Sequence, residues 1–374
     1  MNKLKVLSLF SGIGAFEKAL SNLGVDYELV GYSEIDKYAS KSYCAIHGVN
    51  ESLNFGDITK IDIKNLPKAD LITHGSPCQS WSLAGKNEGG DKGSGTRSSL
   101  MWYSVEIIRE VRPKYVIWEN VKNVLSKKHR HNFDLYIDTL DKMGYKSYFE
   151  VLNAKNYGVP QNRERIFVIS ILGEHKPFIF PEEIPLTLKL KDILEDNVDE
   201  KYYLKNTKEF FIKNSFKMEF RGNGLSPTLD TMQGGWRQPC IIDATKILKV
   251  PQATKSGYID MELPGIADLS YPSSKTRRGR VQEEGKISPC IAATQQDICY
   301  IEYKDNSLLN IDILNQLRIR KLTPKECWRL MAFTDSDIEK CMSIGISNTQ
   351  LYKQAGNSIV VSILEGIFKE LLLK

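Results

Sequence analysis

The opening of the chain carries the pattern that most restricts its fold. Residues 6–10 (VLSLF) are typical of a buried strand, residues 11–14 (SGIG) of a tight turn, and residues 15–20 (AFEKAL) of the start of a helix. A second apolar run at residues 27–34 ends in Glu34. A strand, a turn, a helix and a further strand make a βαβ unit, so we expect an α/β fold with a mixed, mostly parallel sheet of the Rossmann-like kind.

The glycine turn and the acids that follow it indicate a nucleotide-like ligand. Glycines let the backbone approach a ligand closely, and an acid about 20 residues later is where such folds bind ribose hydroxyls. Asp57, within residues 54–58 (NFGDI), is a further acid after the glycine turn. These residues alone fit NAD, FAD or an adenosyl cofactor, and a purely structural glycine turn is an equal alternative.

The cysteine at position 78 is the strongest candidate for chemistry. An apolar run at residues 69–73 leads into Gly75 and Pro77, which end the predicted strand and hold Cys78 at its carboxyl end. Ligands of open α/β sheets bind at that edge. A thiolate presented there suits nucleophilic chemistry, whereas the alternative is an inert buried cysteine.

The following segments bring further polar groups to the same edge. Residues 85–97 contain five glycines and no apolar anchor, which predicts a mobile loop and a candidate lid. Residues 100–111 show the periodicity of a helix, and residues 114–121 (KYVIWENV) predict a buried strand that delivers Glu119 beside Cys78.

Two arginines lie between the next two predicted strands. Residues 133–143 predict a helix, and residues 148–152 and 166–171 predict a hairpin-like strand pair. Arg163 and Arg165 share one side of the extended stretch between these strands. They are candidates for binding an anion, and surface pairing with acids is the alternative.

The composition indicates a chain for a reducing, cytoplasmic compartment. A length of 374 residues is enough for two domains, and the composition, 41% hydrophobic and 26% charged, is ordinary for a globular protein. The net charge of +5 is a weak indication of a polyanionic partner. The seven cysteines show no disulfide or zinc spacing, so we expect no metal. No apolar run reaches the length of about 18 residues that predicts a membrane span.

Together these segments resemble the C5 cytosine-specific DNA methyltransferases of bacteria and phages. The matching motifs, in the order of that family, are residues 10–14 (FSGIG), Glu34, 56–58 (GDI), 75–79 (GSPCQ), 119–121 (ENV), 161–165 (QNRER), 320–327 (RKLTPKEC) and 354–358 (QAGNS). Eight motifs in order span nearly the whole chain. The resemblance implies S-adenosylmethionine as cofactor, double-stranded DNA as substrate, and methyl transfer to cytosine C5.

The resemblance also implies residue roles at the cofactor. The cofactor-binding set is Phe10, Gly12, Gly14, Glu34, Ile35, Asp57, Ile58, Leu100, Asn357 and Ser358. Glu34 would take the ribose hydroxyls. The chain departs from the family at Ser8, where an acid is common, and at Ile35, where an aromatic is common, so we expect a weaker adenine contact.

At the reacting base, the resemblance gives Cys78 the addition to C6 and Glu119 the proton at N3. Arg163 and Arg165 would hold the base oxygen and the adjoining phosphate and favour the thiolate. The target cytosine has to leave the duplex stack for this chemistry. Residues 79–97 would close over it, with Gln79, Ser80 and Trp81 as candidates to fill the vacated space and Arg97 as a further DNA contact.

We expect residues 1–185, completed by residues 316–374, to form the catalytic domain, and residues 186–315 to form a smaller, β- and loop-rich target-recognition domain. Candidate DNA contacts in the latter are Arg277, Arg278 and Arg280. We expect a monomer, with a separately acting restriction endonuclease as an open partner. Two alternatives stay open: a transfer-RNA methyltransferase on the same scaffold, and a catalytically silent DNA-binding relative.

Overall fold

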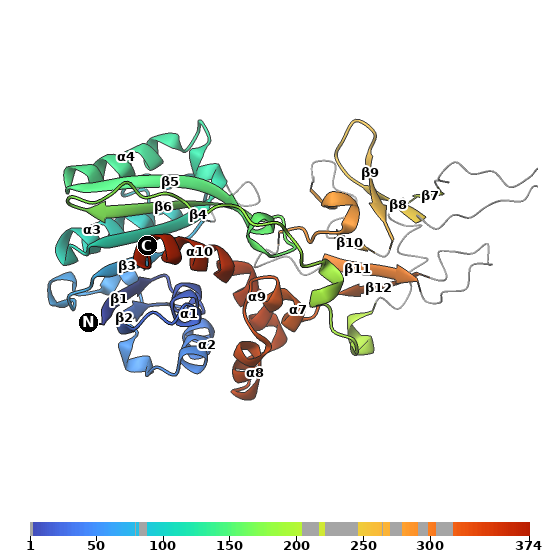
Figure 1. The fold of residues 1–374 in the computed structure, drawn as a ribbon, viewed down its shortest axis with the longest axis horizontal. Helices are drawn as coiled ribbons and strands as arrows, with labels where there is room; N and C mark the ends of the chain where they lie inside the picture. The colour runs from blue at the N-terminus through green and yellow to red at the C-terminus, as the bar shows by residue number, and fades with distance from the viewer. Residues whose placement is uncertain are drawn as a thin grey trace, which may run out of the picture. The chain divides into compact units, whose positions relative to one another are not determined.

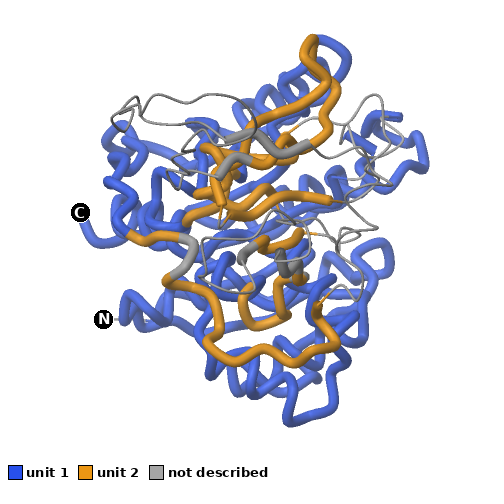
Figure 2. Tube along the Cα trace, turned by 90° about the vertical axis from the view of Figure 1, so that its right-hand side faces the viewer, with its two compact units in different colours: residues 1–159, 163–187, 327–374 blue, residues 160–162, 188–326 orange. Residues whose placement is uncertain are grey.

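The computed structural model describes residues 3–78, 80–81, 88–203, 217–220, 246–263, 265–269, 279–290, 298–303 and 317–374. The chain divides into two compact units (Figure 2). The first comprises Met1–Val159, Arg163–Thr187 and Cys327–Lys374, and the second comprises Pro160–Asn162 and Leu188–Glu326.

The first unit is organised around a six-stranded sheet in the order β2-β1-β3-β4-β6-β5 (Figure 1). The strands are β1 (Leu4–Leu9), β2 (Tyr27–Ser33), β3 (Leu71–His74), β4 (Tyr115–Val121), β5 (Tyr145–Asn153) and β6 (Glu164–Leu172). The first four are parallel, whereas β6 runs antiparallel to both β4 and β5. The predicted α/β class with a mixed, mostly parallel sheet is confirmed.

Two helices cover the central strands through a continuous apolar core. They are α3 (Met101–Val111) and α4 (Arg130–Lys142), and each ends close to its predicted position. The core residues they contribute lie at helical spacing: Trp102, Val105 and Ile108 on α3, and Phe133, Tyr136 and Leu140 on α4. They pack on Ile72, Val116 and Trp118 of the sheet. Each buried side chain of this size contributes about 1.5–3 kcal/mol.

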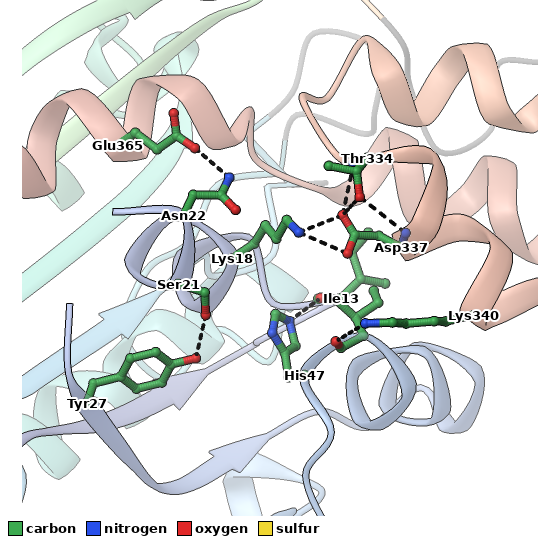
Figure 3. A network of polar contacts seen from close by, with 11 residues as sticks. Ile13, Lys18, Ser21, Asn22, Tyr27, His47, Thr334, Asp337, Lys340 and Glu365 are labelled. Carbon is green, nitrogen blue, oxygen red and sulfur yellow. Dashed lines mark hydrogen bonds and ion pairs between the residues drawn. The ribbon is translucent and has the colours of Figure 1, made fainter. Parts of the chain in front are cut away.

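The C-terminal segment returns to the N-terminal helices α1 (Ala15–Asn22) and α2 (Lys37–His47). It forms α8 (Asp335–Ser343), α9 (Asn348–Asn357) and α10 (Val361–Leu372), after α7 (Pro324–Arg329), which crosses the division between the units. Lys18 of α1 binds Asp337 of α8 at 2.9 Å, and Asn22 donates to Glu365 of α10 at 2.6 Å (Figure 3). These polar contacts join segments more than 300 residues apart within one unit.

The described part of the second unit is built from antiparallel strands. One sheet contains β7 (Lys217–Phe220), β8 (Lys246–Pro251) and β9 (Tyr258–Glu262), and the other contains β10 (Gly265–Asp268), β11 (Ile298–Tyr303) and β12 (Leu317–Lys321). β12 follows the expected return point at residue 316 but pairs with β11. The chain therefore leaves the second unit only after Glu326.

Candidate functional site

Three segments converge at the carboxyl edge of the central strands. β3 and β4 are parallel with His74 opposite Trp118, so Glu119 lies one residue beyond the end of β3, where the Cys78 loop begins. β6 is antiparallel to β4, and its register sets Arg165 opposite Val121. The start of β6 therefore meets the end of β4. Arg165 Nε lies 3.2 Å from Glu119 Oε1.

The electrostatics of this edge are dominated by burial. Burial raises the pKa of the Glu119 carboxyl, and the Arg165 and Arg163 guanidiniums lower it in part. A carboxyl that holds its proton more tightly than usual suits proton donation. Burial also raises the pKa of the Cys78 thiol, which Arg165 lowers and Glu119 raises further. The arginines act in the expected direction, but the net shift does not favour the thiolate.

Arg163 has a structural partner that its sequence motif does not reveal. Its side chain is 3% exposed, and Nη2 donates to the carbonyls of Gly356 at 3.1 Å and Ser358 at 2.7 Å. Its backbone N–H donates to Asn153 Oδ1 at 3.1 Å. Arg163 thus ties the start of β6 to the segment before α10, almost 200 residues later.

The turn that carries Cys78 is held from β4. Trp118 Nε1 donates to Ser76 Oγ at 3.1 Å, and Asn120 Nδ2 donates to the Ser76 carbonyl at 2.9 Å. Asn120 itself is oriented by the Val121 N–H, which donates to its side-chain oxygen at 2.9 Å. The residues on either side of Glu119 therefore support the loop that precedes Cys78.

Glu34 lies where it closes the glycine turn. Its Oε2 accepts the Gly12 N–H and its Oε1 accepts the Asp36 N–H, each at 2.8 Å. Burial raises the pKa of this carboxyl, and the two N–H donors lower it in part. A carboxylate oxygen has lone pairs for a second donor, so these bonds leave room for ribose hydroxyls.

The backbone of the turn is left-handed at three positions. Phe10, Gly12 and Gly14 have φ of 53°, 57° and 80°. A Cβ on Gly14 would lie 2.1 Å from His47 Nε2, which donates to the Ile13 carbonyl at 3.0 Å (Figure 3). Only glycine fits at position 14, because both its conformation and its surroundings exclude a side chain.

The remaining predicted cofactor residues differ in exposure. Ile35 is 75% exposed beside Glu34, and Asn357 is exposed at the end of α9, whereas Ile58 and Ser358 are buried and Leu100 is half-buried. Asp57 caps the 3₁₀ turn Ile58–Lys60 by accepting the Thr59 N–H at 3.0 Å.

Comparison with known proteins decides the family. Residues 4–373 match the family described as C-5 cytosine-specific DNA methylase. This chain belongs to that family. Over its whole length it is 38% identical to the orphan methyltransferase M.SPRI of Bacillus phage SPR, of which it covers 98%. It is 34% identical to the type II methyltransferase M2.ScrFI of Lactococcus lactis subsp. cremoris, with 98% of this chain and 99% of that protein covered.

Solved structures agree with the fold of this cytosine-specific methylase. The Entamoeba histolytica methyltransferase EhMeth aligns over the full length of both chains with a TM-score of 0.67 and 16% identity. The S. pombe Dnmt2 methyltransferase aligns over 100% of this chain and 98% of its own, with a TM-score of 0.63 and 18% identity. The predicted resemblance to the family and the predicted enzyme class are confirmed.

Two of the candidate DNA contacts after Cys78, Ser80 and Trp81, are buried in this methylase. The Trp81 indole is fully buried, edge-on to Trp118 at a ring distance of 6.1 Å, and Ser80 is buried as well. A Cβ on Gly90 would lie 2.3 Å from the Trp81 ring, so Gly90 packs closely against that ring. Residues 85–97 contain no apolar anchor of their own, and Trp81 provides one from outside the segment. An indole gains more from burial than from display at a polar surface.

Arg280 of the methylase is also not a surface contact. Its side chain is 1% exposed, and Nη1 donates to the Asp268 carbonyl at 3.0 Å in the interior of the second unit. The methylene groups of a buried arginine contribute to packing, in addition to the hydrogen bonds of its guanidinium. Arg97 is exposed at the start of the 3₁₀ turn Arg97–Leu100. Gln79, Arg277 and Arg278 lie outside the described residues.

No helix among the described residues is long and apolar enough to cross a bilayer. The same residues contain no group of three or more His, Cys, Asp or Glu side chains arranged to hold a metal ion. Six of the seven cysteines fall within the described residues, and all six are free thiols.

Proposed function

We propose that this methylase transfers the methyl group of S-adenosylmethionine to C5 of a flipped-out cytosine in a specific double-stranded DNA sequence, through a covalent bond between Cys78 and C6. The observation that carries the proposal is the convergence of Cys78, Glu119 and Arg165 at one sheet edge, with the Arg165–Glu119 pair at 3.2 Å. The family membership supports the substrate class.

The chemistry assigns a separate task to each group. The Cys78 sulfur bonds to C6, and the ring electrons displaced towards N3 are met by the proton held on Glu119. C5 becomes enamine-like and takes the methyl group, and the electrons of the broken methyl–sulfur bond stay on the sulfur. Loss of the C5 proton to water then re-forms the C5–C6 double bond and expels the Cys78 thiolate, and N3 returns its proton to the Glu119 carboxylate. Arg165 orients Glu119 throughout, because its guanidinium pairs with the carboxylate that forms.

The residues around Glu34 fit the adenosine part of the cofactor. Glu34 would accept the ribose hydroxyls, the exposed Ile35 would pack on the adenine, and the left-handed turn through Gly12 exposes backbone to the methionine part. The cofactor supplies an electrophilic methyl group on a sulfonium. Ser358 and Asn357 adjoin the Arg163 anchor, which would link this pocket to the base site.

We further propose that the second unit reads the DNA sequence. Its described part is strand-rich, and in the sequence it is flanked on both sides by segments of the first unit, which carries Cys78. Sequence is read through hydrogen bonds and apolar contacts to the base edges in the grooves, so we assign that task to the unit that does not carry Cys78. With Arg280 buried, Arg277 and Arg278 remain the candidates from the basic run.

The test compares Cys78→Ser with Cys44→Ser, a matched variant at another half-buried thiol. DNA carrying 5-fluorocytosine at the target should form a covalent adduct with the parent and Cys44→Ser but not with Cys78→Ser, because a hydroxyl is far less nucleophilic. Since the Cys78 pKa is raised, adduct formation should accelerate as pH rises above neutrality. Labelled methyl transfer to transfer RNA instead of DNA, or an adduct with Cys78→Ser, would refute the proposal.

A further inference from the structure

The chain around Cys78 is held at two serines, Ser76 and Ser98. The Trp81 N–H donates to the Cys78 carbonyl at 3.0 Å. Ser76 is held from β4, as described above. The other support comes from Ser98, which lies in the 3₁₀ turn Arg97–Leu100 immediately before α3 and is 0% exposed.

The Ser98 hydroxyl bonds to the chain on both sides of Cys78. It donates to the Pro77 carbonyl at 2.9 Å and accepts the Ser80 N–H at 3.1 Å. Its one proton and one of its lone pairs are therefore committed to the residue before Cys78 and to the residue two places after it. Ser80 is buried too, so water is poorly placed to replace these bonds.

We propose that Ser98 is a positioning residue that clamps the Cys78 turn to the rigid start of α3 and so sets the approach of the thiol to the base. This inference rests on the proposed role of Cys78 as the nucleophile. Ser76, held by Trp118 and Asn120, anchors the turn to the sheet, and Ser98 anchors it to the helix layer. With both anchors, the backbone before and after Cys78 is tied to two different rigid elements.

Ser99 provides a matched control for this proposal. It is the adjacent residue of the same 3₁₀ turn, it is buried, and its hydroxyl donates to the Thr96 carbonyl at 2.7 Å, away from Cys78. Ser98→Ala and Ser99→Ala therefore each remove one buried hydroxyl and one side-chain-to-carbonyl bond. Only Ser98→Ala releases the backbone that carries the thiol.

The first readout is covalent adduct formation with 5-fluorocytosine DNA at saturating DNA. Because misplacing a reacting group by about 1 Å costs on the order of 100-fold, we expect Ser98→Ala to form the adduct about 10- to 100-fold more slowly. The KM for DNA and the affinity for S-adenosylmethionine should change little. Ser99→Ala should stay within about twofold of the parent, and Ser98→Thr, which restores the hydroxyl, should recover part of the lost rate.

The second readout needs no methyltransferase activity. Iodoacetamide alkylation of each cysteine, followed by mass spectrometry, should show Cys78 reacting several-fold faster in Ser98→Ala, because a released turn exposes the thiol. The buried Cys327 and Cys341 serve as internal controls and should stay protected. If all three cysteines react faster together, Ser98 has only a general structural role and the proposal fails.

Equal adduct rates for Ser98→Ala and Ser99→Ala would also overturn it. If the parent protein itself formed no adduct and methylated no DNA, the proposed function would fail instead. The Cys78-selective alkylation would still decide whether Ser98 clamps the turn, so the two failures are distinguishable.

Discussion

Glu34→Ala tests the proposed cofactor site by removing a carboxylate that accepts two backbone hydrogen bonds. The Gly12 and Asp36 N–H groups both lose an acceptor at 2.8 Å. A hydrogen bond to a charged group contributes about 1.5–3 kcal/mol, and here the cost of burying the carboxylate offsets part of that gain. Since water can reach this half-buried position, we expect the free energy of unfolding without cofactor to fall by about 2 kcal/mol.

Cofactor binding should suffer a separate loss. If the ribose hydroxyls donate to the same carboxylate, their bonds are worth about another 1.5–3 kcal/mol, which is about tenfold or more in affinity. Titration calorimetry measures the S-adenosylmethionine affinity, and urea unfolding without cofactor measures the stability. Glu34→Gln should restore little, because its NH₂ group would face one of the two N–H donors.

Glu28→Ala is the control, since it removes an exposed carboxylate from the same strand, β2. It should leave both quantities unchanged. Unaltered S-adenosylmethionine affinity in Glu34→Ala would refute the placement of the ribose at Glu34. Unaltered stability would show that the bond to Gly12 does not hold the glycine turn.

Two further predictions concern residues next to this turn. Glu17 is buried, and burial raises the pKa of its carboxyl above the ordinary 4.5, although the Ser8 and Tyr43 hydroxyls lower that pKa in part. The folded protein therefore holds this proton more tightly, so its stability falls as pH rises from about 4.5 through the raised pKa. In urea unfolding, Glu17→Gln should be more stable than the parent at pH 8, by on the order of 1 kcal/mol, and equal to it near pH 4; a constant difference would contradict this. Ile35→Phe should tighten S-adenosylmethionine binding about three- to tenfold in calorimetry, because aromatic stacking adds about 0.5–1.5 kcal/mol; weaker binding would place the adenine elsewhere.

Local sequence determined the elements and the chemical groups of this methylase. Alternating and continuous apolar runs predicted the strands that became β1 to β6, because the side-chain period of a strand or helix is a local property. Gly75 and Pro77 ended β3 and delivered Cys78 to the carboxyl edge for the same local reason. Parallel β3 and β4 then brought Glu119 there, as the apolar run before it predicted.

Tertiary structure alone decided which polar groups are used as supports. Arg163 reads as a substrate contact, yet it donates to the carbonyls of Gly356 and Ser358. Trp81 and Arg280 were candidate DNA contacts, yet both are buried, and Ser98 belongs to none of the motifs of the sequence. No local pattern encodes these outcomes. A buried polar group takes whichever partner the packing of distant segments brings within about 3 Å, and that choice exists only once the chain has folded.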